Sequence, residues 1–125
     1  DLLHYGHITF LKNAKQPNTF LLVALESDEY IVNHKRRHPI HTQEQRAEIL
    51  SQLRCVDAVV MLPYLANDRE YDQMVRTIAP DTVAITEGDT QTENKKKQVQ
   101  KIGSKIKIVT KPLSDYSTTS ISQQI

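Results

Sequence analysis

The chain has 125 residues, enough for one compact domain with a sizeable core but not for two. Its 16 basic and 15 acidic side chains nearly cancel, so capture of nucleic acid or membrane by bulk electrostatic attraction is not expected. The single cysteine, Cys55, provides no disulfide framework, and no apolar run is long enough to span a membrane. We therefore expect a single soluble, cytoplasmic domain over residues 1–125.

The first half of the chain alternates helical and strand patterns. Residues 8–15 carry apolar side chains on one helical face and are followed by a Gln-Pro-Asn sequence that ends the helix. Residues 19–25 form a continuous apolar run of strand length, as in a strand buried on both faces. Thr42 and Gln45 have the spacing of a capping box, which predicts a helix over residues 43–54.

The second half of the chain repeats this alternation and predicts three strands and two helices: strands at residues 57–62, 81–86 and 104–111, and helices at residues 67–79 and 92–103. A closing helix would begin with a cap at Ser117 or Thr118. The alternation predicts an α/β fold, a Rossmann-like parallel sheet with helices on both faces. Because the series opens on a helix, we also expect a strand upstream of Asp1.

The short sequence HYGH places His4 and His7 three residues apart around Gly6, at the start of a predicted helix. Residues with this spacing lie on one side of a helix, and the first amides of a helix attract anions. A glycine there lets a large ligand approach the backbone. This pattern favours phosphate binding, with imidazoles donating hydrogen bonds to a charged transition state. The alternative is two incidental surface histidines at a helix cap.

The sequence DLLHYGHITFLKNAK resembles the HxGH signature of a nucleotidyltransferase superfamily. This superfamily includes the glycerol-3-phosphate, phosphocholine and phosphoethanolamine cytidylyltransferases and the heptose-phosphate adenylyltransferases. The resemblance continues in VALESDEY, KRRHPIHTQEQRAEILSQLRCVDAVV, ITEGD and STTSI, and so covers nearly the whole chain. It implies an enzyme that joins a nucleoside triphosphate to a small phosphorylated alcohol and releases pyrophosphate, with Mg²⁺ as cofactor.

The resemblance also implies roles for single residues. His4 and His7 would contact the nucleotide phosphates and stabilise the pentacoordinate phosphorus, without a covalent enzyme intermediate. Lys35 would supply positive charge from a flexible segment, and Arg46 would hold substrate phosphate; the alternatives are a solvated loop and a helix-surface ion pair. The remaining implied contacts are with the nucleotide, at Asp1, Gly6, Gly88, Asp89, Ser117, Thr118 and Thr119, and with the second substrate, at Asp28, Arg36 and Arg37. Asp1 also matches a family position near the metal.

Cytidylyl transfer from CTP to a polyol phosphate such as glycerol 3-phosphate is the first expectation. Adenylyl transfer from ATP to a sugar phosphate or to flavin mononucleotide is the alternative. Glycerol-3-phosphate cytidylyltransferases carry an arginine where this chain has Pro112 or Leu113, and ITEGD differs from the matching turns, so the reaction class is better supported than the base or the acceptor. The resemblance further implies a homodimer.

Two other classes of function compete with the enzyme. A non-catalytic nucleotide or RNA binder is suggested by HKRRHPIH, but that sequence has no interleaved aromatic residues, and we expect no nucleic-acid partner. A metal protein would use His34, His38 and His41, although Pro39 interrupts any helix that they could share.

Overall fold

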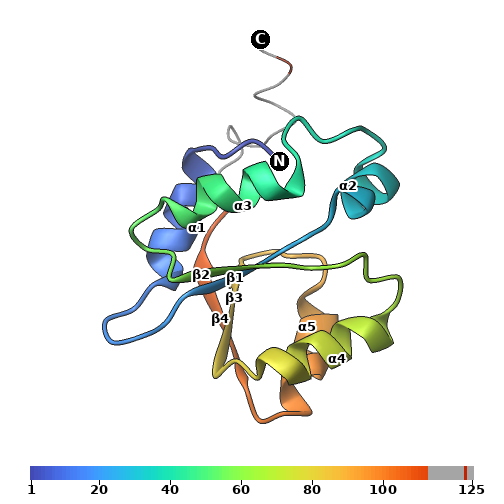
Figure 1. Ribbon diagram of the computed structural model, residues 1–125. Coiled ribbons are helices and arrows are strands. Elements are labelled where there is room, and N and C mark those ends of the chain that lie inside the picture. Colours follow the sequence, from blue (N-terminus) through green and yellow to red (C-terminus); the bar gives the residue numbers. More distant parts are fainter. Residues whose placement is uncertain (113–122, 124–125) are drawn as a thin grey trace. The chain divides into compact units, whose positions relative to one another are not determined.

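The computed structural model describes residues 1–112 and residue 123 (Figure 1). The elements in chain order are α1 (Tyr5–Ala14), β1 (Leu22–Leu25), α2 (Asp28–Lys35), α3 (Gln43–Ser51), β2 (Ala58–Met61), α4 (Asp68–Ile78), β3 (Thr82–Thr86), α5 (Thr92–Gln100) and β4 (Lys105–Thr110). These elements fall into two compact units, Asp1–Leu65 and Ala66–Pro112. No helix among the described residues is long and apolar enough to cross a membrane.

The first unit is built on the parallel pair β1 and β2, with Leu22 opposite Ala58 and Leu25 opposite Met61. Helices α1 and α3 lie side by side over these strands (Figure 1). The apolar side chain of Leu11 on α1 is buried in the unit. A parallel pair covered by helices in this way is the local arrangement that a strand-helix-strand sequence favours.

The second unit contains the parallel pair β3 and β4, in register from Thr82 and Lys105 up to an irregularity between Ile85 and Thr86. Helix α5 packs on β4, and α4 lies beside α5 (Figure 1). Ile85 and Val99 are the most deeply buried side chains of this unit, at 2% and 3% exposed. Helix α5 is mostly polar, and its contact with the interior of the unit is made by few apolar side chains, chiefly Val99.

The predicted α/β class with parallel strands is confirmed. Within the described residues the strands form two parallel two-stranded ladders, β1–β2 in the first unit and β3–β4 in the second. The single domain and the strand upstream of Asp1 stay predictions. The predicted closing helix at Ser117 or Thr118 lies outside the described residues.

Several predicted boundaries were wrong. Helix α1 begins at Tyr5 and not at residue 8, because His4 itself caps the helix. Helix α3 ends at Ser51 and α5 at Gln100, each one turn early, because the chain continues in tighter turns that close with hydrogen bonds such as Leu53 N–H to Leu50 C=O. Each strand is shorter than the predicted one, by one to three residues at an end.

Helix α2 (Asp28–Lys35) was not predicted at all. Its signals are a Ser27 cap, whose hydroxyl accepts a hydrogen bond from the Tyr30 backbone, and acidic residues in the first turn. Only Ile31 of this helix is buried, so the sequence lacks the apolar periodicity on which helix prediction depends.

Candidate active site

The two histidines of HYGH cap helix α1 reciprocally. His4 Nδ1 accepts a hydrogen bond from the Gly6 backbone at 3.1 Å, and His7 Nδ1 accepts one from the His4 backbone at 3.3 Å. Each ring therefore holds one amide through Nδ1, which places the proton of the neutral imidazole on Nε2. The predicted anion cradle needs a correction, because these two amides are occupied by the histidines. An anion here would be met by the Nε2–H group of His4, and by that of His7 only in exchange for the hydrogen bond of His7 with the Leu2 backbone.

The environment keeps both imidazoles neutral at pH 7. Burial lowers the pKa of His4 below its ordinary value of 6.5. Burial, and then the neighbouring His4, lower the pKa of His7 to about 4, while a hydrogen bond with the Leu2 backbone opposes this shift. A neutral imidazole remains a hydrogen-bond donor, so the pair can stabilise negative charge that builds up on a phosphate without itself carrying charge.

The carboxylate of Asp1 is occupied by the segment that follows α2. Oδ2 accepts hydrogen bonds from Arg37 Nη1 and from the Ile40 backbone, both at 2.7 Å. Oδ1 accepts one from the His41 backbone at 3.1 Å. The Asp1 side chain is only 1% exposed. In the structure, therefore, Asp1 and Arg37 bind each other. The family resemblance had instead assigned Asp1 to the nucleotide and Arg37 to the second substrate.

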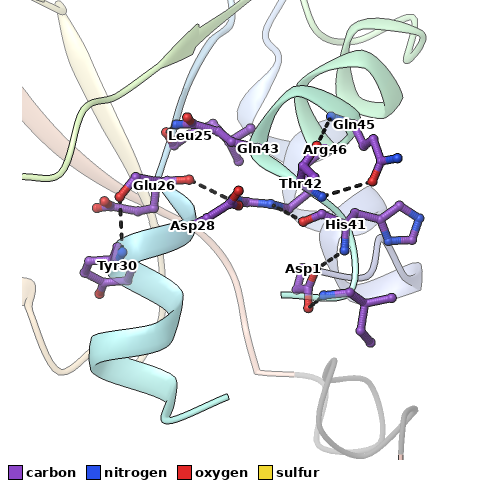
Figure 2. Close-up of polar contacts among 12 residues, drawn as sticks. Asp1, Leu25, Glu26, Asp28, Tyr30, His41, Thr42, Gln43, Gln45 and Arg46 are labelled. Carbon is purple, nitrogen blue, oxygen red and sulfur yellow. Dashed lines mark hydrogen bonds and ion pairs between the residues drawn. The ribbon is translucent and has the colours of Figure 1, made fainter. Parts of the chain in front are cut away.

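Arg46 is buried at the first turn of α3, and each of its three guanidinium nitrogens donates a hydrogen bond to the protein (Figure 2). Its Nε donates to the His41 carbonyl at 3.2 Å and its Nη1 to the Glu26 carbonyl at 3.0 Å. Its Nη2 donates to Asp28 Oδ1 at 2.6 Å. The ion pair with Asp28 corresponds to the alternative weighed for Arg46, except that the arginine is buried and does not lie on the helix surface.

Gln43 is a site-forming residue that sequence reasoning missed. Its Nε2 donates to the carbonyls of Leu25 at 3.0 Å and Leu62 at 2.8 Å, at the carboxyl ends of β1 and β2. Gln43 and Arg46 therefore fasten the start of α3 to the end of the sheet where ligands bind in open parallel folds. No sequence signal marks this role, because a glutamine at the first position of a helix is ordinary.

His7, Arg46 and Asp1 line one cavity of about 220 Å³ between α1, β1 and α3, whose other lining residues are apolar. Three residues predicted from distant parts of the sequence are thus brought to one space. Lys35 and Arg36 are exposed and make no hydrogen bond or ion pair within residues 1–112.

In the second unit, the turn Glu87–Gly88–Asp89 follows β3. Gly88 has a φ of 79°, a left-handed conformation that glycine adopts without strain. Asp89 accepts a hydrogen bond from the Gln91 backbone at 2.7 Å and pairs with Lys95 at 2.5 Å. Burial alone would raise the pKa of Asp89, but the hydrogen bond from Lys95 lowers it below its usual range. Ser117, Thr118 and Thr119 lie outside the described residues.

Within the described part of the chain, no group of three or more histidine, cysteine, aspartate or glutamate side chains could hold a metal ion. The alternative of a metal site at His34, His38 and His41 therefore gains no support. Asp1, which the family pattern places near the metal, has its oxygens committed to Arg37 and two backbone amides. Magnesium bound mainly through nucleotide phosphates and water needs no such protein cluster, so Mg²⁺ stays a prediction.

Comparison with known proteins gives matches over most of the chain. A family model described as cytidylyltransferase-like matches residues 1–124. The FAD synthase of Thermococcus kodakarensis is 38% identical over 127 residues, which cover 96% of this chain and 81% of that protein.

Two further matches are narrower or more distant. The glycerol-3-phosphate cytidylyltransferase of Bacillus subtilis is 43% identical over 60 residues, covering 48% of this chain and 46% of that protein. The crystal structure of a lipopolysaccharide core biosynthesis protein from Thermoplasma volcanium superposes with a TM-score of 0.69 at 24% identity, covering 94% of this chain and 91% of that one. This last match shows the fold.

Proposed function

The chain belongs to the cytidylyltransferase-like family of nucleotidyltransferases, and on that basis we propose that it transfers the adenylyl group of ATP to flavin mononucleotide, forming FAD and pyrophosphate. The observation that carries this choice is coverage: the match to an FAD synthase extends over 96% of this chain, whereas the match to a glycerol-3-phosphate cytidylyltransferase extends over 48%. The alternative in which the acceptor is a flavin is therefore better supported than the first expectation of CTP and glycerol 3-phosphate.

In the proposed reaction, a phosphate oxygen of flavin mononucleotide attacks the α-phosphorus of ATP. The bond from the α-phosphorus to the bridging oxygen breaks, and that oxygen leaves as part of pyrophosphate. Negative charge increases on the bridging and non-bridging oxygens as this happens. The role of His4 and His7 is to donate N–H hydrogen bonds to these oxygens, and their neutral state is suited to it; for this His7 exchanges its hydrogen bond with the Leu2 backbone for one with the phosphate.

The reaction also brings two anions together, which costs electrostatic energy unless fixed positive charge lies nearby. Lys35 and Arg36 are exposed and directly precede Arg37, which pairs with Asp1, and we assign the phosphates to these two cations. Bound Mg²⁺ would neutralise further charge on the triphosphate. The remaining contribution is positioning, which Gln43 and Arg46 provide by fixing the start of α3 to the strand ends.

The test is a substrate panel with the purified intact protein and Mg²⁺. ATP and CTP are each combined with flavin mononucleotide, glycerol 3-phosphate and a sugar 1-phosphate, and pyrophosphate is measured together with the nucleotidyl product. We expect FAD and equimolar pyrophosphate from ATP with flavin mononucleotide, and a loss of about a hundredfold or more in His7→Ala. His34→Ala is the matched control. His34 is exposed, and its ring stacks on Tyr30, not on His4 or His7.

Pyrophosphate release with CTP and glycerol 3-phosphate alone would replace the proposal with the cytidylyl reaction. Turnover that survives His7→Ala would remove the histidine from its assigned role. The homodimer implied by the family resemblance stays a prediction, which light scattering of the purified protein would decide.

A further inference from the structure

The segment of residues 35–41, here called the basic segment, is held in place mainly by polar contacts. It leaves α2 through Arg36, whose φ of 52° is left-handed and turns the chain sharply. Its most apolar side chain, Ile40, is 52% exposed, so burial of apolar surface contributes little to its position. What fixes the basic segment must therefore be its hydrogen bonds and ion pairs.

Two side chains from other parts of the fold hold the backbone of one residue of this segment, His41. Asp1 accepts from the backbone N–H of His41 at 3.1 Å, and Arg46 donates to the backbone carbonyl of His41 at 3.2 Å (Figure 2). Asp1 adds the Ile40 backbone and the guanidinium of Arg37, both at 2.7 Å. Arg46 in turn is tied to Asp28 at the start of α2.

Asp1 also divides the positive charges of the segment into two groups. Its buried carboxylate neutralises Arg37. Lys35 and Arg36 have no acidic partner within residues 1–112. The same carboxylate thus pairs with one cation and restrains the backbone of the segment that carries the other two.

We propose that Asp1 is a positioning residue, whose carboxylate anchors the basic segment so that Lys35 and Arg36 meet the substrate phosphates, and that Arg37 belongs to this anchor and not to the substrate site. The assignment rests on the proposed nucleotidyl transfer only for the identity of the ligand. The anchor itself is a property of the fold and is measurable without any substrate.

The first test is limited trypsin digestion of the intact protein, with cleavage after Lys35, Arg36 and Arg37 followed by mass spectrometry. Asp1→Asn keeps the size of the side chain but replaces an acceptor oxygen with an NH₂ group facing N–H donors. We expect about tenfold faster cleavage within the basic segment, with cleavage at Lys12 and Lys101 unchanged. Arg37→Gln, which keeps both backbone contacts of Asp1, should give a smaller acceleration at Lys35 and Arg36.

Asp57→Asn is the matched control. Asp57 likewise accepts from a cation, Lys15 at 2.5 Å, and from a backbone amide, Leu21 at 2.7 Å, but far along the chain from the basic segment. It should leave cleavage at residues 35–37 as in the wild type. Unchanged cleavage there in both Asp1→Asn and Arg37→Gln would overturn the anchor, and so would an equal acceleration at every site in the chain, which would report general loosening.

The second test asks whether Asp1 acts through Lys35. If it does, kcat/KM for transfer should fall about tenfold in Asp1→Asn and about tenfold in Lys35→Ala. In the double variant kcat/KM should fall by much less than the product of these two fold-changes. Multiplying effects would overturn the positioning role. If the wild type transfers no nucleotidyl group, the proposed function fails, while the digestion still decides whether Asp1 anchors the segment.

Discussion

The imidazole rings of His4 and His7 stack with their centroids 3.8 Å apart and their planes at 28°. Two rings this close repel each other when both are protonated, and both are partly removed from water. The reciprocal cap and the stacking together hold a neutral pair at the start of α1. This arrangement links the start of a helix to the chemistry proposed for it.

The pair should make the stability of the fold depend on pH. The unfolded chain takes up protons at its histidines near pH 6.5, whereas folded His7 binds one only near pH 4. The free energy of unfolding should therefore be unaffected by this source above pH 6.5 and decrease as pH falls from there to about 4. Urea unfolding over this range measures it; His7→Gln should flatten the curve, and His34→Gln should not. Parallel curves for wild type and His7→Gln would contradict the assignment.

His4 has a structural role and a proposed chemical role that substitutions can separate. His4→Ala should lose about 1 kcal/mol of stability with the cap, while His4→Asn should keep most of it because asparagine is a good cap. Both should lose about a hundredfold in transfer, since neither places an imidazole N–H there. Asn67→Ala, which removes the cap of α4 at 3.1 Å, is the control that loses stability but not activity. Full activity in His4→Asn would contradict the donor role.

Lys35 should matter to transfer and not to folding. Its side chain has no partner within residues 1–112, so Lys35→Ala should change the free energy of unfolding by less than about 0.5 kcal/mol. The same substitution should raise KM or lower kcat for the phosphorylated substrates. Lys97→Ala removes an equally exposed charge from α5 and serves as control. If the two variants affect transfer equally, Lys35 acts only through the net charge of the protein and has no specific role toward the phosphates.

Arg46 and Asp28 should respond unequally to substitution. Arg46 is 6% exposed, and removing it leaves the carbonyls of Glu26 and His41 without this donor, so Arg46→Ala should cost about 3 kcal/mol. Asp28→Asn should cost less than Arg46→Ala, because asparagine keeps an oxygen to which Arg46 Nη2 can donate, but more than about 1 kcal/mol, because the buried guanidinium loses its carboxylate. Thermal unfolding of both variants measures this difference. An Arg46→Ala variant of unchanged stability but no activity would assign Arg46 to the substrate after all.

Gly88 and Gly103 form a matched pair in the second unit. Both have positive φ, 79° and 74°, and a Cβ at either position would meet nothing within 4 Å. Alanine at each should therefore cost about 1 kcal/mol, from backbone strain alone. Only Gly88→Ala should also impair transfer, because Gly88 belongs to the predicted nucleotide-contacting turn. Equal transfer rates in the two variants would remove Gly88 from the site.

Much of this molecule follows from local sequence. The capping box predicted from the spacing of Thr42 and Gln45 is present: the Thr42 backbone donates to the Gln45 side chain at 3.0 Å, and the Gln45 backbone donates to the Thr42 side chain at 3.2 Å. Asn67 caps α4 in a similar way. The parallel strands follow from apolar runs between helices, and the histidine pair from its three-residue spacing. The caps and the histidine pair depend on residues close together in the chain, whose relative positions the backbone geometry already restricts, whereas the strands pair residues as distant as Leu22 and Ala58.

What the tertiary structure decided is which side chains find each other across long stretches of sequence. Asp1 and Arg37 are 36 residues apart, and Arg46 and Asp28 are 18 apart. Before the fold is known, each of these residues is equally a ligand for phosphate or a partner for another charge. Folding decides between these partners because a buried charge is costly unless it is paired: the burial of Asp1 and Arg46 committed them to protein partners, while the side chains of Lys35 and Arg36 stayed exposed and without an acidic partner within residues 1–112.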